Sequence, residues 1–89
     1  MRSIGRKRQE KLNKAISALV DARLKGFEAI FYSRNDYTAQ IIAYKFANRH
    51  WDEEGMNIAQ WRCSRYIEPR RITFEEADRL IRKHIGFGS

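Results

Sequence analysis

The sequence has little of what marks a secreted, membrane-bound or disulfide-bonded protein. Its single cysteine, Cys63, cannot form an internal disulfide, which excludes a small disulfide-stapled scaffold. Residues 1–14 contain no apolar segment of the kind that a signal peptide requires. The longest apolar runs, such as residues 29–32, fall far short of the roughly 20 residues that a membrane-spanning helix needs. We therefore expect a cytoplasmic protein that does not enter membranes.

Residues that carry catalysis or bind metals are also scarce. His50, Cys63 and His84 do not fall at the spacing of a zinc site, and the acidic run at residues 52–54 is typical of a solvated helix end. No glycine-rich phosphate loop is present, and no serine or cysteine motif accompanies either histidine. Alternation along residues 59–63 places Cys63 on the packed face of a strand, where a thiol behaves as a small apolar group. We expect no catalytic site, no metal and no cofactor.

The length and the composition predict one small folded domain. A chain of 89 residues with 43% hydrophobic and 12% aromatic residues has the material for a single core. We predict a flexible basic arm at residues 1–6 and a single domain over residues 7–89.

The first half of that domain predicts helix, strand and helix. One apolar face predicts a helix over residues 7–25 that ends at Gly26; it comprises Leu12, Ile16, Leu19, Val20 and Leu24. Residues 27–33 are rich in aromatic and β-branched side chains and predict a strand whose residues Phe27, Ala29 and Phe31 face the helices. Capping-type residues at 33–36, followed by apolar stripes on two sides, predict a second helix.

The second half predicts strands and a closing helix. Residues 56–67 alternate as one long strand or as a hairpin, and residues 70–72 add a short further strand. Thr73 and Glu76 form a capping box for the last helix, which Gly86 ends. The predicted fold class is α+β, or small α/β, in the order α-β-α-β-α, with a two- to three-stranded sheet and the helices on one face. Strands joined through the second helix would be parallel, and so thin a sheet indicates a missed strand or a homodimer.

Positive charge is the strongest functional signal. Eighteen Lys and Arg residues oppose eleven Asp and Glu residues, for a net charge of +7. Residues 1–14 hold six of these cations, opposed by Glu10 alone: Arg2, Arg6, Lys7, Arg8, Lys11 and Lys14. On a helix, Lys7, Lys11 and Lys14 lie along one edge, where they can follow a phosphate backbone and release its counterions. The alternative is a solvated helix face preceded by a frayed tail.

Two further groups of residues fit a polyanion. Arg62, Arg65, Arg70 and Arg71 surround Tyr66, and arginine favours bidentate phosphate contacts, although Glu75 and Glu76 offer local ion pairs instead. The strand alternation also places a set of polar and aromatic side chains on one sheet face, where unpaired bases can stack: Tyr32, Gln60, Arg62, Ser64 and Tyr66. A half-solvated face, or one covered by a partner, is the alternative.

The leading hypothesis is a small basic protein that binds DNA or RNA through phosphate contacts of its N-terminal helix. Its candidate residues are the six N-terminal cations with Arg62, Tyr66, Arg70 and Arg71. The rival hypothesis is an inhibitor or adaptor that binds an acidic or other protein surface, of the kind that phages and mobile elements direct at host complexes. Aromatic residues dominate interface hot spots, and the anchors would be Tyr37, Tyr44, Trp51 and Tyr66.

Overall fold

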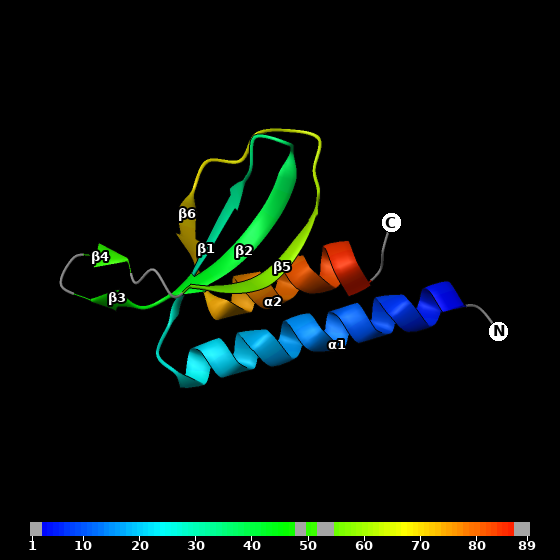
Figure 1. Cartoon of the computed structure of the whole chain (residues 1–89), viewed down its shortest axis with the longest axis horizontal. Coiled ribbons are helices and arrows are strands. Elements are labelled where there is room, and N and C mark those ends of the chain that lie inside the picture. The colour runs from blue at the N-terminus through cyan, green and yellow to red at the C-terminus, as the bar shows by residue number, and fades with distance from the viewer. Residues whose placement is uncertain (1–2, 48–49, 52–54, 87–89) are drawn as a thin grey trace.

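The computed structural model describes residues 3–47, 50–51 and 55–86 (Figure 1). Its helices are α1 (Ser3–Leu24), α2 (Phe74–Ile81) and a π-helical turn η1 (Arg82–Gly86) that continues α2. Its strands are β1 (Glu28–Ser33), β2 (Thr38–Tyr44), β3 (Phe46–Ala47), β4 (His50–Trp51), β5 (Met56–Arg62) and β6 (Arg70–Ile72). None of the helices so described is long and apolar enough to cross a membrane. The protein is of the α+β class, as predicted.

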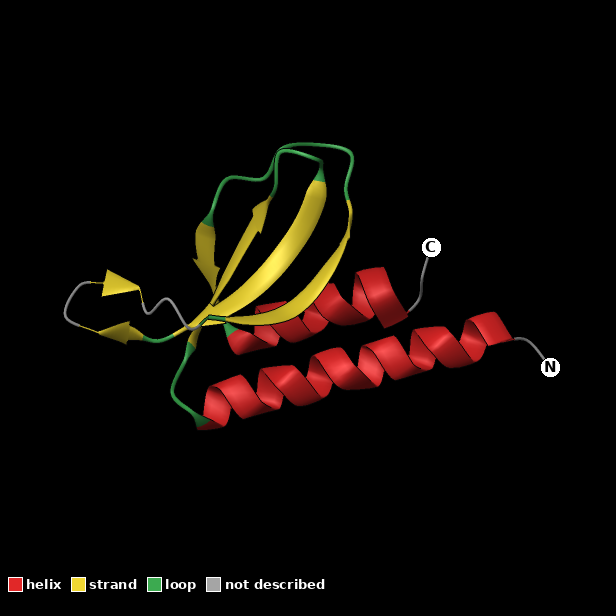
Figure 2. Cartoon of the chain, viewed as in Figure 1, coloured by secondary structure: helices red, strands yellow, loops and turns green. Residues whose placement is uncertain are grey.

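A four-stranded antiparallel sheet forms the centre of the fold, in the order β5-β2-β1-β6. Both α1 and α2 lie on one face of it (Figure 2). β3 and β4 pair separately as a two-stranded ribbon between β2 and β5. The predicted parallel crossover is therefore wrong, and of the two explanations for a thin sheet the missed strand is the one that the structure shows.

The predicted second helix is wrong, because residues 38–44 form the central strand β2. Residues 39–43 of β2 are all buried, so the apolar residues of this strand form an almost continuous run rather than an alternating one. Such a run cannot be distinguished from a buried helix by periodicity. Thr38, Ile41, Ile42 and Tyr44 are β-branched or aromatic, which favours a strand. The capping-type residues ahead of it form a turn, in which Asp36 Oδ1 accepts a hydrogen bond from Thr38 N at 3.2 Å.

The predicted first helix is present, but it starts earlier, and only Leu12, Ile16 and Leu19 of its predicted face pack in or against the core. It begins at Ser3, so residues 3–6 of the expected arm belong to α1. Ala15, Leu19 and Ala22 are buried, whereas Val20 is 52% exposed and Leu24 is 81% exposed. Small alanines allow α1 to lie close to the sheet and to α2, and a pattern built on large apolar residues misses that seam.

Several predicted helix ends are confirmed. Gly26 adopts a left-handed φ of 78°, and a Schellman motif forms through Gly26 N to Arg23 O and Phe27 N to Ala22 O. Thr73 is the N-cap of α2 and its Oγ1 accepts a hydrogen bond from Glu76 N at 3.0 Å. The expected contact of Phe87 with the end of the last helix lies outside the described residues.

The core fills the space between the helices and the sheet. Ala29 and Phe31 of β1 face the helices as predicted, together with Ala39 and Ile41 of β2. The pairing of β2 with β5 shifts between Ile41 and Ile42, and Ile58 is buried in the core rather than on the far face where simple alternation places it. The far face of the sheet is left without a covering helix (Figure 2).

Candidate nucleic-acid interface

The N-terminal half of α1 carries a row of exposed cations. Arg6, Lys7, Arg8, Lys11 and Lys14 are all exposed. Within the described part of the chain, none of them lies within ion-pair distance of a carboxylate. The side chains of Gln9 and Asn13 hydrogen-bond each other at 2.9 Å on the same helix. The sixth predicted cation, Arg2, lies outside the described residues.

This half of α1 lies beside the C-terminal end of α2. The two helices run antiparallel, and the N-terminal end of α1 extends past the end of α2 (Figure 1). Leu12 of α1 lies against Gly86 of η1, where a Cβ would be 3.4 Å from Leu12 Cδ2. The cations of α1 and those of η1 are thus at the same end of the molecule.

A second basic surface is a groove between the β5–β6 loop and the α2–η1 segment. It has a volume of about 620 Å³, and its basic lining residues are Arg62, Arg65, Arg70, Lys83 and His84. Among the residues that the structure describes, no aspartate or glutamate lines it. Arg62 and Arg70, which the sequence analysis placed in one basic segment, therefore do come together, and Arg65 joins them.

Two of the predicted arginines already have acidic partners. Arg70 Nη2 lies 2.9 Å from Glu76 Oε2, and Arg71 Nη1 lies 3.2 Å from Glu28 Oε1. Both arginines therefore form ion pairs within the protein, as the alternative to phosphate binding predicted. Only Arg70 pairs with one of the two glutamates expected for this role, Glu75 and Glu76. Arg71 pairs with Ile30 in the sheet and does not line the groove. Arg62 and Arg65 have no ion pair with a carboxylate of the described residues.

Aromatic rings form one wall of the groove. Trp61 stacks on Phe31 with ring centroids 5.8 Å apart and on His84 with centroids 4.8 Å apart. The Arg70 guanidinium lies 5.7 Å from the centroid of Phe31. Burial, and secondly the charge of Lys83, lower the pKa of His84 below its ordinary value of 6.5. His84 is therefore neutral at pH 7, and the permanent charge of the groove comes from its arginines and Lys83.

Hydrogen bonds hold the loop that forms the opposite rim. Ser33 Oγ at the buried end of β1 accepts from Ile67 N at 2.7 Å, and Ser33 N donates to Ile67 O at 2.9 Å. Cys63 N donates to Tyr37 O at 2.9 Å, which joins the loop to the β1–β2 turn. Tyr37 has a φ of 60°, a left-handed conformation that costs a bulky residue free energy. Exposed Tyr66, between groove residues Arg65 and Ile67, is thereby presented on an anchored loop.

Part of the predicted sheet-face set is brought together. Tyr32 pairs with Gln40, and Gln40 pairs with Gln60, so these three side chains form one row on the uncovered face. Arg62 pairs with Thr38 at the end of that face. Ser64 and Tyr66 lie beyond β5 in the loop, so they extend past the sheet rather than complete its face.

The residues of the rival protein-binding hypothesis lie in different environments. Tyr37 is 55% exposed and Tyr66 is 61% exposed. Tyr44 is half-buried, and its ring covers Gly55 so closely that a Cβ there would overlap the ring. Trp51 belongs to β4 and pairs with Phe46, and its side chain is outside the described part.

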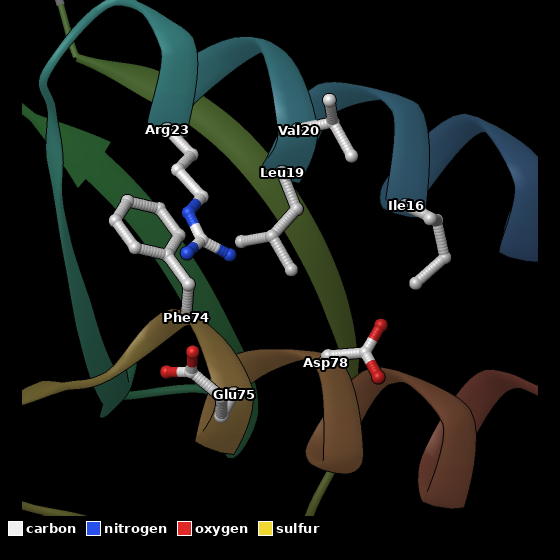
Figure 3. Close-up of a pocket in the computed structure, with 7 residues that line it drawn as sticks. All are labelled: Ile16, Leu19, Val20, Arg23, Phe74, Glu75 and Asp78. Atoms are coloured by element: carbon white, nitrogen blue, oxygen red, sulfur yellow. The ribbon is translucent and has the colours of Figure 1, made fainter.

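An apolar groove between α1 and α2 is a feature that the sequence analysis missed. Its lining side chains are Ile16, Leu19, Val20, Arg23, Phe74, Glu75 and Asp78 (Figure 3). The pocket has a volume of about 300 Å³, and the Arg23 side chain extends from α1 toward Phe74 and Glu75 of α2 (Figure 3). The sequence held an indication of this groove. The buried seam of α1 is narrow because alanines form most of it, so Val20 and Leu24 of the predicted apolar face do not fit into it.

The candidate metal and nucleophile residues can be followed only in part. In the described ranges no group of three or more His, Cys, Asp or Glu residues is positioned to hold a metal. The acidic run at 52–54 and the side chain of His50 lie outside them. Cys63 is a free, half-buried cysteine packed against the core, and its Sγ contacts the Arg65 carbonyl oxygen at 3.3 Å.

Lys83, His84 and Trp61 are among the groove residues that the candidate set omitted. Lys83 and His84 had an adequate local explanation, since cations near a helix C-terminus suit its dipole. Only the chain reversal between β6 and α2 brings them to Arg62 and Arg65, and no local pattern encodes that approach.

Comparisons with protein-family models, with curated proteins and with solved structures find no match for this chain.

Proposed function

We propose that this protein binds nucleic acid through the N-terminal half of α1, by contacts with the phosphate backbone and without catalysis. The observation that supports this function is the row of exposed cations on α1 that have no carboxylate partner in the described part of the chain. Lys7 and Lys14 are about 10 Å apart along the helix axis. Each strand of a duplex has one phosphate for every 3.4 Å of the duplex axis, so an edge that lies parallel to that axis spans about three phosphate steps.

The charge has no evident role in the fold. The side chains of Lys7, Lys11 and Lys14 lie off the buried seam of α1, and unpaired cations on one helix edge repel one another. Binding that depends on phosphates carries little sequence information, so the proposal is for a general affinity to which other residues add selectivity. A cytoplasmic location, where nucleic acid is accessible and Cys63 stays reduced, fits the proposal.

Salt dependence tests the proposal directly. On duplex, the logarithm of the affinity falls with the logarithm of salt concentration by about 0.9 for each phosphate neutralised. The α1 variant, with Lys7→Gln, Lys11→Gln and Lys14→Gln, should flatten that slope by about 2–3 and weaken binding to all sequences alike. Fluorescence anisotropy with labelled duplexes measures it.

A matched control separates a local contact from a loss of net charge. The charge control, with Arg23→Gln, Lys25→Gln and Lys45→Gln, removes the same charge from exposed positions near the other end of α1. Its slope should change by less than about 1, because those cations lie away from the proposed contact. Absence of binding to duplex and to single strands even near 50 mM salt, where screening is weak, would refute the proposal.

A protein partner is the second candidate function. It is favoured by the exposure of Val20 and Leu24, apolar side chains on α1 of which Val20 lines the groove in Figure 3. Large apolar side chains that a small protein leaves exposed together mark interaction sites. Capture of partners with and without nuclease distinguishes the two functions. Capture that resists nuclease and is abolished by Val20→Ser and Leu24→Ser would favour a protein partner.

A further inference from the structure

We infer that the basic groove between the β5–β6 loop and η1 binds an unpaired segment of nucleic acid, with Tyr66 at its rim as a stacking platform. The inference rests on the proposed function and adds a second contact surface with a preference for unpaired over paired strands. Proteins that bind single strands combine a cationic groove for the backbone with aromatic rings on which bases stack.

The charge of the groove fits a phosphate-bearing ligand. Arg62, Arg65 and Lys83 converge on one cavity from β5, the loop and η1, and none of the described residues that line it is acidic. None of the three has an ion pair with a carboxylate of the described residues. Arg70 is already paired with Glu76, which leaves three cations for a ligand. Arginine binds phosphate oxygens in a bidentate manner and stacks on planar groups.

The shape of the groove favours an unpaired segment. Its volume of about 620 Å³ falls in the range of cavities that enclose small molecules, and a base can enter only when it is not stacked inside a duplex. Tyr66 lies between two residues that line this cavity, Arg65 and Ile67, and its exposed ring is available to a base. Tyr37, exposed on the adjoining turn, offers a second ring near the same rim.

The architecture around the groove is preorganised. Ser33 holds the loop at Ile67 and Tyr37 holds it at Cys63, so the rim is ordered before a ligand arrives. Lys83 and His84 belong to a π-helical turn, a departure from α-helical geometry that is frequent at functional sites. Because the cations of α1 lie at the same end of the molecule, one nucleic acid with a paired and an unpaired part can contact both surfaces (Figure 1).

A hairpin duplex with and without an unpaired thymidine tail of about six nucleotides tests the inference. We expect the wild-type protein to bind the tailed hairpin at least about tenfold more tightly than the blunt one. The groove variant, with Arg62→Gln, Arg65→Gln and Lys83→Gln, should abolish that preference and leave the affinity for the blunt hairpin unchanged. On the tail alone it should flatten the salt slope by about 2, at about 0.7 for each phosphate of a single strand.

Tyr66 variants test the stacking contact separately. Tyr66→Ala should weaken binding of the tail by about tenfold, whereas Tyr66→Phe, which keeps the ring, should bind it as the wild type does. In a Trp51→Phe background the remaining Trp61 lies in the groove wall, and its emission should change on addition of the tail but not of the blunt hairpin. The charge control should retain both affinities, and thermal unfolding checks that each variant folds.

The outcomes separate this inference from the proposed function. If the groove variant weakens the blunt and the tailed hairpin equally, or neither, the groove is not a site for unpaired nucleotides and the inference is overturned. The function proposed for α1 survives that result when the α1 variant still weakens the blunt hairpin. A mononucleotide that competes as well as the tail would also overturn it, since the occupant would then be a free nucleotide. Loss of all binding only in the groove variant would instead overturn the role of α1.

Discussion

The hydroxyl of Ser33 connects the sheet to the loop that carries Arg65 and Tyr66, and removing it tests how firmly that loop is held. Ser33 is buried, and its Oγ accepts the Ile67 N–H at 2.7 Å. In Ser33→Ala the backbone link from Ser33 N to Ile67 O, at 2.9 Å, is retained. The change therefore removes this acceptor and the long hydrogen bond that Ser33 Oγ donates to Ile67 O at 3.5 Å, and it leaves the backbone link in place.

We expect Ser33→Ala to lower the free energy of unfolding by about 1–2 kcal/mol. A typical hydrogen bond contributes about 1 kcal/mol net, and a buried donor left without an acceptor costs about 1–3 kcal/mol. Ile67 is half-buried, so water partly replaces the lost acceptor and the cost falls in the lower part of that range. Each 1 kcal/mol corresponds to a fall in Tm of about 4–8 °C for a domain of this size.

Urea unfolding measures this loss, and amide hydrogen exchange at Ile67 localises it. The urea midpoint should fall without a change in the slope, because the area exposed on unfolding stays the same. Ser64→Ala is the matched control, since Ser64 is an exposed serine of the same loop. A wild-type exchange rate at the Ile67 amide together with an unchanged midpoint would refute the reasoning, and with it the preorganised rim.

Three further predictions concern the turn, the cap and the histidine near the two surfaces. Tyr37→Gly should be more stable than Tyr37→Ala by about 1 kcal/mol, because both lose the ring and only glycine suits a φ of 60°; equal urea midpoints would contradict this. Thr73→Ala should destabilise the fold by about 1 kcal/mol through loss of the bond to Glu76 N, and an unchanged Tm would show that the cap contributes nothing. The lowered pKa of His84 means that the unfolded state binds a proton more readily, so the stability that neutral His84 contributes is present above about pH 6.5 and lost as the pH falls through the folded pKa. Burial and the charge of Lys83 both act in that direction, and His84→Gln should show a smaller fall in Tm between pH 7.5 and pH 5 than the wild type.

The parts of the fold that local chemistry specifies could be predicted from the sequence. Gly26 ends α1 because a left-handed residue is needed there, and Thr73 begins α2 because its hydroxyl caps a free N–H. The strand at residues 28–33 alternates visibly because one of its faces is uncovered. Residues 38–44 could not be assigned in this way, since residues 39–43 are all buried and the strand therefore lacks the alternation that identifies one.

The candidate site could likewise be predicted only where local sequence specifies it. The cations of α1 follow one another in the chain, so their shared edge could be read from helical spacing. The groove could not, because Arg62 and Lys83 meet only after β6 has paired with β1 and α2 has returned across the sheet. The ion pair of Arg71 could not be predicted either, since its partner Glu28 lies on a neighbouring strand that is far away in sequence.

The net charge of +7 can be interpreted by asking which cations have a carboxylate partner and which do not. The described ion pairs join Lys25 to Asp21, Arg70 to Glu76, Arg71 to Glu28 and Arg82 to Asp78. Each of these pairs contributes only roughly 0–1 kcal/mol to the stability of the fold. Of the described cations without a carboxylate partner, five lie on the N-terminal half of α1 and three line the groove, although their mutual repulsion opposes that arrangement. A polyanionic ligand that spans both surfaces would relieve this repulsion, which is why we propose the function there.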